Sequence, residues 1–244
     1  PLGRNILGEA GRLRGFRSED IQRFARRLYR PDRMVFFVYG RIEPAYACRE
    51  ITKALKRVAS SLPEGHPFQT LLQTDASPAR PDRNDAGRTA VPEYRPQTVT
   101  LHKDTHQAHV MIGARAYSAR DPRHLSLYLL NNILGGPGMN SRLNLSLREK
   151  HGLVYTVESV MTTYTDTGLW NVYFGCDPHD VARCRRLVLK ELRRLAEAPL
   201  APHALEAAKR QIKGQIGISY DNFENVALAM GKTFLHYDRA RDLN

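Results

Sequence analysis

The sequence is poor in cysteine and lacks any long hydrophobic run. Its 244 residues include three cysteines, Cys48, Cys176 and Cys184, and none of them belongs to a C-x-x-C pair. An odd number of scattered cysteines argues against a disulfide framework or a thiolate metal site, so we expect buried free thiols. No apolar stretch approaches the roughly 20 residues that a membrane-spanning helix needs. A membrane span is therefore not expected.

Acidic residues are scarce relative to basic ones. The chain carries 37 Lys and Arg against 25 Asp and Glu, which gives a formal net charge of +12. A basic balance is typical of nucleic-acid binding when the cations cluster beside stacking aromatic side chains. Here the arginines are spread along the chain, and the densest cluster, residues 183–194, has the pattern of the solvated side of an amphipathic helix. We therefore expect no nucleic-acid partner.

Residues 18–62 have the pattern of a helix, a strand and a second helix. Ser18 and the two acidic residues after it supply an N-cap and a favourable first turn. The apolar run MVFFVYG at residues 34–40 predicts a buried strand, and apolar residues at helical spacing predict a helix over 47–62. Six prolines among polar and basic residues then predict a linker over residues 63–96.

The rest of the chain combines strands with separate helices. Val99 and Leu101 alternate with polar residues, and so do the apolar residues of 108–112. The first set occupies odd positions and the second even positions, so one continuous strand would place them on opposite faces. A bend is therefore expected near residues 103–105. Residues 153–162 and 168–176 have the pattern of paired strands. Helices are predicted to begin at Asp121, near Ser141 and at Asp177, and to cover 202–216 and 222–237. Separate helices and strands favour an α+β fold over a parallel wound sheet.

Few residues offer metal or nucleophile chemistry. His102, His106 and His109 are close in sequence, but His109 would point away from the other two on a regular strand. No H-x-x-E-H or inverted form occurs in the sequence, so polar strand positions are the preferred interpretation of these histidines. No Ser or Cys lies in a recognisable nucleophile turn. We expect no catalytic residue and no metal ligand in this chain.

A glycine cluster, Gly135, Gly136 and Gly138, precedes Arg148 and Tyr155. Such a cluster can cradle a phosphate, but this one follows a predicted helix and lacks G-x-x-x-x-G-K-[ST]. Arg offers five fixed donors and Tyr one hydroxyl, so the two could grip a peptide carbonyl or stabilise a developing oxyanion if another component supplied the nucleophile. The alternative, a surface Arg at a helix end and a core Tyr, stays open on these residues alone.

The run over residues 130–178 resembles the second half of the insulinase/pitrilysin family of zinc metallopeptidases, which includes mitochondrial processing peptidase. The shared features are a leucine-rich helix, a glycine turn before S-R-L, R-E-K-x-G-L-x-Y, D-T-G between two strands, and a D-P helix start. Residues 205–219 resemble the helix that follows, and residues 1–44 resemble the end of the family's first half. Pro137 inside the glycine turn departs mildly from the pattern.

The resemblance implies a fold and a division into parts. The expected fold is the α/β roll of mitochondrial processing peptidase, an α+β fold with a mainly antiparallel sheet and helices on one face. Residues 1–62 would be the tail of the first, catalytic-type half, and residues 63–96 the linker. Residues 97–244 would be the second, zinc-free half, truncated at its C-terminal end. Arg148 and Tyr155, seven residues apart, match the pair with which that half binds substrate.

The resemblance also implies a function. The chain would be the non-zinc-binding domain of a zinc metalloendopeptidase, contributing peptide binding and transition-state positioning to proteolysis by its parent protein. Alone it would be inactive and hold no cofactor, because the zinc ligands belong to the missing first half. Its partners would be a peptide or unfolded polypeptide and the missing half or a homologous subunit, with a homodimer as a further option. A soluble protein of the bacterial periplasm or cytoplasm is expected.

Two further expectations follow from the resemblance. The alternative function is that of a structural or assembly subunit of the same family, without peptidase activity. In addition, the strand predicted at residues 34–40 could fill a missing place in the sheet that contains residues 168–176, in the same chain or in a dimer.

Overall fold

The computed structural model describes residues 5–29, 34–61 and 93–237. The chain forms two compact units, residues 1–87 with 219–244 and residues 88–218, and each is considered by itself. The predicted linker over 63–96 lies almost wholly outside the described residues. None of the described helices combines the length and apolar character that crossing a bilayer requires.

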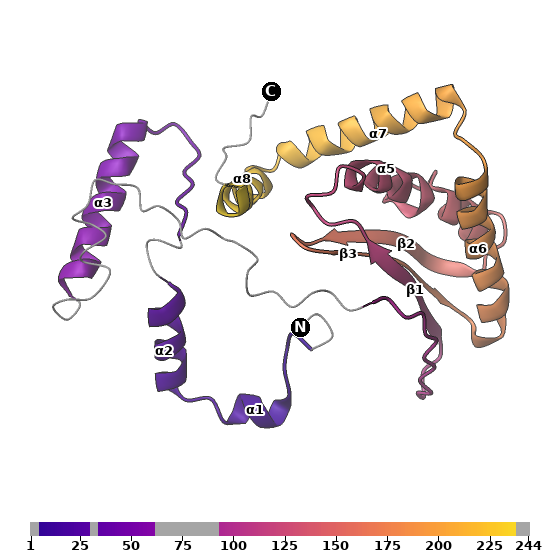
Figure 1. Cartoon of the computed structure of the whole chain (residues 1–244), viewed down its shortest axis with the longest axis horizontal. Helices are drawn as coiled ribbons and strands as arrows, with labels where there is room; N and C mark the ends of the chain where they lie inside the picture. The colour runs from indigo at the N-terminus through magenta and orange to yellow at the C-terminus, as the bar shows by residue number, and fades with distance from the viewer. Residues whose placement is uncertain (1–4, 30–33, 62–92, 238–244) are drawn as a thin grey trace. The chain divides into compact units, whose positions relative to one another are not determined.

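The described part of the first unit is helical. It contains α1 (Ala10–Arg14), α2 (Ser18–Leu28), α3 (Pro44–Ser60) and α8 (Phe223–Tyr237), as Figure 1 shows. Ser18 proves to be the first residue of α2 rather than its cap, and the Asp20 carboxylate accepts a hydrogen bond from the backbone N–H of Arg17 at 3.1 Å. α3 begins with a proline after Glu43, whose carboxylate accepts from the N–H of Tyr46 at 3.0 Å. Both helices were predicted, with slightly different starts.

The strand predicted at residues 34–40 is not formed. Residues 34–39 have no regular secondary structure, and Phe36 and Val38 are exposed. Tyr39 instead stacks on Phe223, with ring centroids 4.5 Å apart. An apolar run becomes a strand only when another strand supplies backbone partners, and the one sheet among the described residues does not include this segment. Residues 34–40 therefore do not complete that sheet within this chain, and their pairing in a dimer stays a prediction.

The second unit contains an antiparallel sheet of three strands. β1 (Ala108–Ala116), β2 (Val154–Thr163) and β3 (Gly168–Cys176) lie in the order β1-β3-β2, with both pairs antiparallel. The predicted bend exists before β1, where the N–H of Thr105 bonds to the carbonyl of Lys103 at 3.0 Å. Val99 and Leu101, however, are exposed and outside any strand, so that part of the prediction is wrong.

Helices pack on one face of this sheet. The core includes side chains of α5 (His124–Gly135), the π-helix η2 (Asn144–Glu149) and α6 (Val181–Glu197). The short η3 (Pro178–Asp180) precedes α6, and α7 (Pro202–Tyr220) is hydrogen-bonded to α5 through Gln215 and Asn132 (Figure 1). Burial along β1 alternates strictly, as expected for a sheet with one covered face. The core consists of one apolar cluster from the sheet, α5, η2 and α6: Leu134, Leu143, Leu147, Val154, Val157, Val172, Phe174, Cys176, Cys184 and Val188. The predicted α+β fold, an antiparallel sheet with helices on one face, is confirmed.

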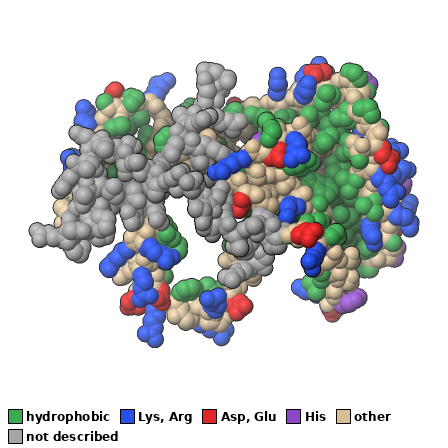
Figure 2. All heavy atoms as spheres, viewed as in Figure 1, with side chains coloured by type: hydrophobic (Ala, Val, Ile, Leu, Met, Phe, Trp, Pro, Cys, Tyr) green, Lys and Arg blue, Asp and Glu red, His purple; other side chains and the backbone are tan. Residues whose placement is uncertain are grey.

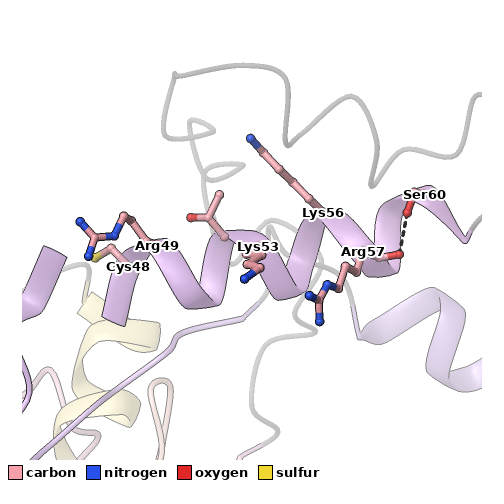
Figure 3. Close-up of a pocket in the computed structure, with 7 residues that line it drawn as sticks. Cys48, Arg49, Lys53, Lys56, Arg57 and Ser60 are labelled. Carbon is pink, nitrogen blue, oxygen red and sulfur yellow. Dashed lines mark hydrogen bonds between the residues drawn. The ribbon is translucent and has the colours of Figure 1, made fainter. Parts of the chain in front are cut away.

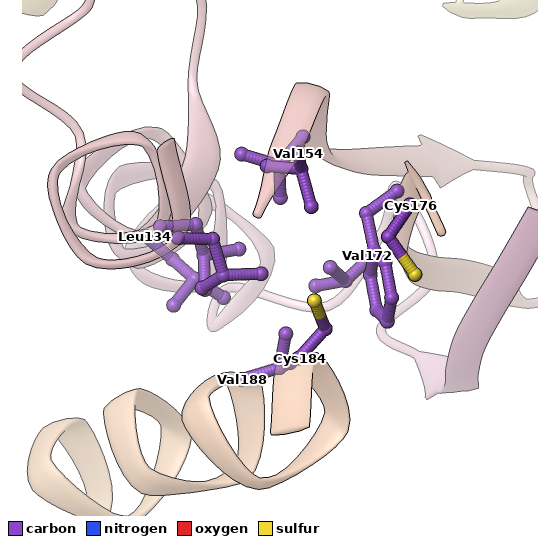
Figure 4. Close-up of a cluster of buried hydrophobic side chains, with 10 residues drawn as sticks. Leu134, Val154, Val172, Cys176, Cys184 and Val188 are labelled. Atoms are coloured by element: carbon purple, nitrogen blue, oxygen red, sulfur yellow. The ribbon is translucent and has the colours of Figure 1, made fainter. Parts of the chain in front are cut away.

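The three cysteines are free, but not all are buried. Cys176 at the end of β3 and Cys184 in α6 lie in the core, with their side chains visible in Figure 4. Burial raises the pKa of both thiols, that of Cys184 to about 12. Cys48 on α3 is exposed, so the expectation of burial is wrong for this residue.

Candidate functional site

The glycine turn brings α5 into close contact with β2. A side-chain Cβ built on Gly135 would lie 2.8 Å from both the backbone nitrogen and the Cβ of Ser159, closer than real Cβ contacts allow. A Cβ on Gly136 would lie 2.7 Å from the carbonyl oxygen of Asn132. These glycines are therefore required for packing of the helix end against the strand. Gly135 and Gly136 therefore serve the fold, as expected from the absence of a phosphate-loop pattern.

Arg148 is presented by the π-helix η2. The N–H of Lys150 bonds to the carbonyl of Leu145 at 3.1 Å, the five-residue spacing of a π turn. Leu143 and Leu147, fully buried, anchor this segment in the core. Because Arg148 directly follows an anchored residue, its position relative to the sheet is fixed by core packing.

A left-handed glycine links η2 to β2. Gly152 has a φ of +60°, and its N–H bonds to the carbonyl of Arg148 at 2.8 Å. This is the conformation in which glycine commonly ends a helix, and other residues adopt it at a cost. The chain then enters β2 at Val154, which places Tyr155 near the start of the strand.

Arg148 and Tyr155 lie together at the surface. The guanidinium carbon of Arg148 is 5.9 Å from the centroid of the Tyr155 ring, a cation–π distance. Tyr155 is 83% exposed, so the interpretation of this residue as a core tyrosine is wrong. The Nε atom of Arg148 lies 3.8 Å from a carboxylate oxygen of Glu149, too far for a strong hydrogen bond. Most of the guanidinium donors therefore remain available to a ligand.

Both residues border a groove along β2. We call it the β2 groove; its lining is Gly135, Gly136, Pro137, Met139, Asn144, Arg148 and the β2 residues 155–160. Its volume is about 420 Å³. The groove offers a guanidinium, a phenol hydroxyl and strand backbone to a bound molecule, a set suited to peptide carbonyls and carboxylates.

A buried polar network that sequence reasoning missed supports this groove. The Asn131 amide donates to the Ser159 carbonyl at 3.0 Å, and its oxygen accepts from the Ser159 hydroxyl at 2.6 Å. The indole N–H of Trp170 lies 3.1 Å from the same Asn131 oxygen and 2.9 Å from the Ser159 hydroxyl. The network ties α5 to β2 and β3 beneath the groove. The signal in the sequence that could have indicated this network is the polar Asn131 within a mostly apolar helix.

Polar strand positions were predicted for the three histidines, but His102 and His106 are exposed and lie outside any strand. His109 lies on β1, and its Nδ1 atom is 2.8 Å from the hydroxyl of Tyr173 on β3. Among the described residues, the one group whose ligand atoms lie close enough to share an ion is Asp177, His179 and Asp180.

That acidic group does not fit the zinc site expected of the family. It lies in a turn around η3, offers one imidazole, and is exposed at Asp177 and His179, whereas the zinc site that the resemblance implies takes two imidazoles from H-x-x-E-H and a distant Glu. The imidazole Nε2 of His179 is also 3.2 Å from an Asp180 carboxylate oxygen. That this chain binds no zinc remains a prediction.

A larger hollow than the β2 groove lies along α3. It has a volume of about 780 Å³ and is lined by residues of that helix alone, among them Arg49, Lys53, Lys56 and Arg57 (Figure 3). One helix face cannot enclose a ligand, so this hollow is a solvated basic surface. In the view of Figure 2, Lys and Arg appear on both units, interspersed with Asp and Glu.

Comparison with known proteins identifies the family. Residues 15–212 match the family model described as the Peptidase M16 inactive domain. An uncharacterized zinc protease of Streptomyces coelicolor is 30% identical over 234 residues, covering 96% of this chain and 48% of the relative. Another, from Bacillus subtilis, is 27% identical over 243 residues, covering all of this chain and 54% of the relative. The chain thus spans about half the length of these curated relatives.

A solved structure shows the same fold. A protease from Helicobacter pylori superposes with a TM-score of 0.69 at 16% sequence identity, covering 95% of this chain and 52% of that one. The family match over most of the chain confirms the resemblance drawn from the motifs around Arg148 and Tyr155. The chain belongs to the M16 family of zinc proteases and contains its inactive peptidase domain.

Proposed function

We propose that this chain supplies the substrate-binding part of a zinc metalloendopeptidase, with Arg148 and Tyr155 contacting the peptide. The observation that carries the proposal is that the two side chains face each other at 5.9 Å on the rim of the β2 groove, with Tyr155 83% exposed. The exposed phenol and the loosely paired guanidinium leave hydrogen-bond donors available to a substrate.

The chemistry of the pair suits an amide substrate. The planar guanidinium can donate two parallel hydrogen bonds, and the phenol can donate a third to the same oxygen or its neighbour. These donors would hold a peptide carbonyl and, more strongly, the negative charge that develops on its oxygen during hydrolysis. In the parent protein, zinc would supply the activated water that attacks the bond. The ligands for that zinc are expected in the half that lies outside this sequence.

Turnover of the intact parent protein tests the assignment. Arg148→Ala should lower kcat/KM by roughly 10²–10³, the usual loss when a charge-stabilising donor is removed. Tyr155→Phe should lower it about tenfold, because one hydrogen bond to a charged oxygen is lost. Tyr164→Phe removes a phenol hydroxyl from the turn between β2 and β3 and serves as the matched control. Wild-type rates in the Arg148 and Tyr155 variants, with folds intact by circular dichroism, would refute the proposal.

A structural or assembly subunit is the second candidate function. It is favoured by the apolar side chains that the first unit exposes, among them Ile21, Phe24, Phe36 and Val38, because such surfaces commonly bind other subunits. The two candidates differ in the upstream sequence. A peptidase parent contains H-x-x-E-H and binds zinc stoichiometrically by metal analysis, whereas a purely structural parent lacks both.

A further inference from the structure

α7 is bonded to the glycine turn, residues 135–140, although it does not itself line the β2 groove (Figure 1). Its residues Gln211 and Gln215 are four positions apart, so they lie on the same face of the helix. The side-chain oxygen of Gln215 accepts a hydrogen bond from the amide of Asn132 at 2.8 Å. The side-chain amides of Gln211 and Asn140 exchange two hydrogen bonds, of 3.1 and 3.3 Å. Because Asn132 precedes the turn and Asn140 ends it, α7 is bonded to both sides of the turn.

Two glycines of the turn leave space for these amide groups. A Cβ added to Gly136 would lie 2.9 Å from the side-chain nitrogen of Asn132, and one added to Gly138 would lie 2.7 Å from that of Gln211. Both distances are shorter than real Cβ contacts. At Gly138 the obstructing atoms are the ends of flexible side chains, so an added methyl group would displace the amide pair rather than the backbone. The absence of a side chain at Gly138 is thus matched to the contact with α7.

α7 contributes little to the apolar core. Among the described residues, the core cluster and the side chains packed against it include none from this helix. Ala208 is buried, whereas Gln211 and Gln215 are half-buried. Removing the two amide contacts should therefore loosen α7 and the turn without opening the core.

The turn forms one wall of the β2 groove. Gly136, Pro137 and Met139 line the groove, and the side chain of Met139 is 61% exposed. A wall that is already fixed costs little to order when a substrate binds, whereas a mobile wall first has to lose conformational freedom. The bonds from α7 therefore favour binding in this groove.

Arg148 is held by different contacts. The buried Leu143 and Leu147 anchor its helix, and both belong to the core cluster. The N–H of Gly152 bonds to the Arg148 carbonyl at 2.8 Å. Loosening the turn should therefore weaken substrate binding more than it weakens the stabilisation of the developing charge, which depends on Arg148.

We infer that Gln211 and Gln215 are positioning residues for the β2 groove: their amide bonds hold the glycine turn where it forms the groove wall. Neither side chain lines the groove, so both act through the turn. The inference rests on the proposed substrate-binding function, and it adds two residues outside the groove that control its shape.

Turnover of the intact parent protein tests the effect on binding. The probe is an internally quenched ten-residue peptide that the wild-type parent cleaves. Gln211→Ala should raise KM about threefold to tenfold and change kcat by less than about twofold, because the two lost hydrogen bonds support binding rather than the chemical step. Gly138→Ala should raise KM to a similar extent, because its methyl group displaces the same amide pair. Lys213→Ala, at an exposed position of the same helix, is the matched control and should leave both constants unchanged.

Hydrogen exchange of the 244-residue chain tests the position of the turn. In Gln211→Ala the backbone amides of residues 138–141 should exchange about tenfold faster, while those of β1 should not change. Asn140→Ala should have the same effect, and the double variant should add little to either single variant, because both remove the same pair. Gln215→Ala should speed exchange mainly at Gly136, whose N–H bonds to the carbonyl of Asn132.

The outcomes separate this inference from the proposed function. Wild-type exchange in the turn, faster exchange with KM unchanged, a fall in kcat alone, or additive effects of Gln211→Ala and Asn140→Ala would each overturn the inference. If Arg148→Ala lowers turnover while Gln211→Ala changes neither exchange nor KM, the proposed function stands and the inference fails. If Gln211→Ala raises KM while Arg148→Ala has no effect, the proposed role of Arg148 fails instead. The fluorescence of Trp170 reports folding, and loss of fold in both Gln211→Ala and Gly138→Ala would assign the amide pair to the core and contradict the inference.

Discussion

The two units of the chain bury their apolar residues very differently. In the sheet unit, ten apolar side chains form one cluster between the strands and helices α5, η2 and α6. In the described part of the other unit, Ala59 and Val226 are the buried apolar side chains, whereas Ile21, Phe24 and Phe36 are exposed. Similar apolar periodicity thus produced a core in one unit and an exposed surface in the other. The amphipathic pattern of a helix predicts which of its faces will be buried. It does not show whether this chain itself contains the segment that covers that face.

The largest test of this contrast is a pair of phenylalanine truncations. Phe174 on β3 is fully buried, whereas Phe24 on α2 is half exposed. Phe174→Ala should lower the free energy of unfolding by about 3–5 kcal/mol through lost burial and a cavity, whereas Phe24→Ala should change it by about 0.5 kcal/mol or less. Urea unfolding followed by the fluorescence of Trp170, the one tryptophan, reports on the sheet unit, and far-ultraviolet circular dichroism of the same samples includes the helices of the other unit. Equal losses in the two variants would contradict the contrast.

Two glycine substitutions test the contrast at smaller amplitude. An alanine at Gly135 would place its Cβ 2.8 Å from Ser159, and the strand must shift to admit it. We expect a loss of about 1–3 kcal/mol, as for other overpacked positions. Gly231 in α8 has no atom within 4 Å of the added Cβ, so Gly231→Ala should stabilise its helix by up to about 1 kcal/mol. Thermal unfolding by far-ultraviolet circular dichroism measures both, and a destabilised Gly231→Ala would show hidden packing there.

The smallest expected effect concerns the reactivity of the three cysteine thiols. At pH 8 without denaturant, one thiol, that of Cys48, should react promptly with a disulfide reagent, and Cys176 and Cys184 should react only after unfolding. Burial raises the pKa of the two core thiols above the unfolded value, so they favour the folded state at neutral pH. That contribution is lost as the pH rises from about 8.5, where unfolded thiols ionise, toward about 12 for Cys184. Prompt reaction of two or three thiols would contradict the buried assignment.

Local signals in the sequence predicted much of the sheet unit. The hairpin of β2 and β3 and the bend before β1 follow from alternation and parity. The segment at residues 34–40 was mispredicted because pairing depends on a partner strand, which no local pattern reveals. Val99 and Leu101 were mispredicted for the same reason.

The candidate site was predicted in part. Arg148 and Tyr155 were singled out by residue type and family spacing, and their proximity is a finding of the structure. The groove, the π-helical geometry of η2 and the Asn131 network could not be predicted, because each depends on contacts between residues far apart in the sequence or on details of hydrogen-bond spacing. The roles of Arg148 and Tyr155 remain proposals.

The π turn in η2 has a consequence for comparing related sequences. The π-helix η2 ends at Glu149, so the direction in which Arg148 points depends on this winding as well as on the seven-residue interval to Tyr155. Removing one residue between Leu143 and Leu147 would favour ordinary α-helical winding and would turn every later position by about 100° around the helix axis. A homologue with such a deletion would keep both an Arg and a Tyr in its alignment, yet its Arg would point to a different part of the surface. Insertions and deletions in this short segment therefore indicate a displaced Arg even where an alignment keeps both residues.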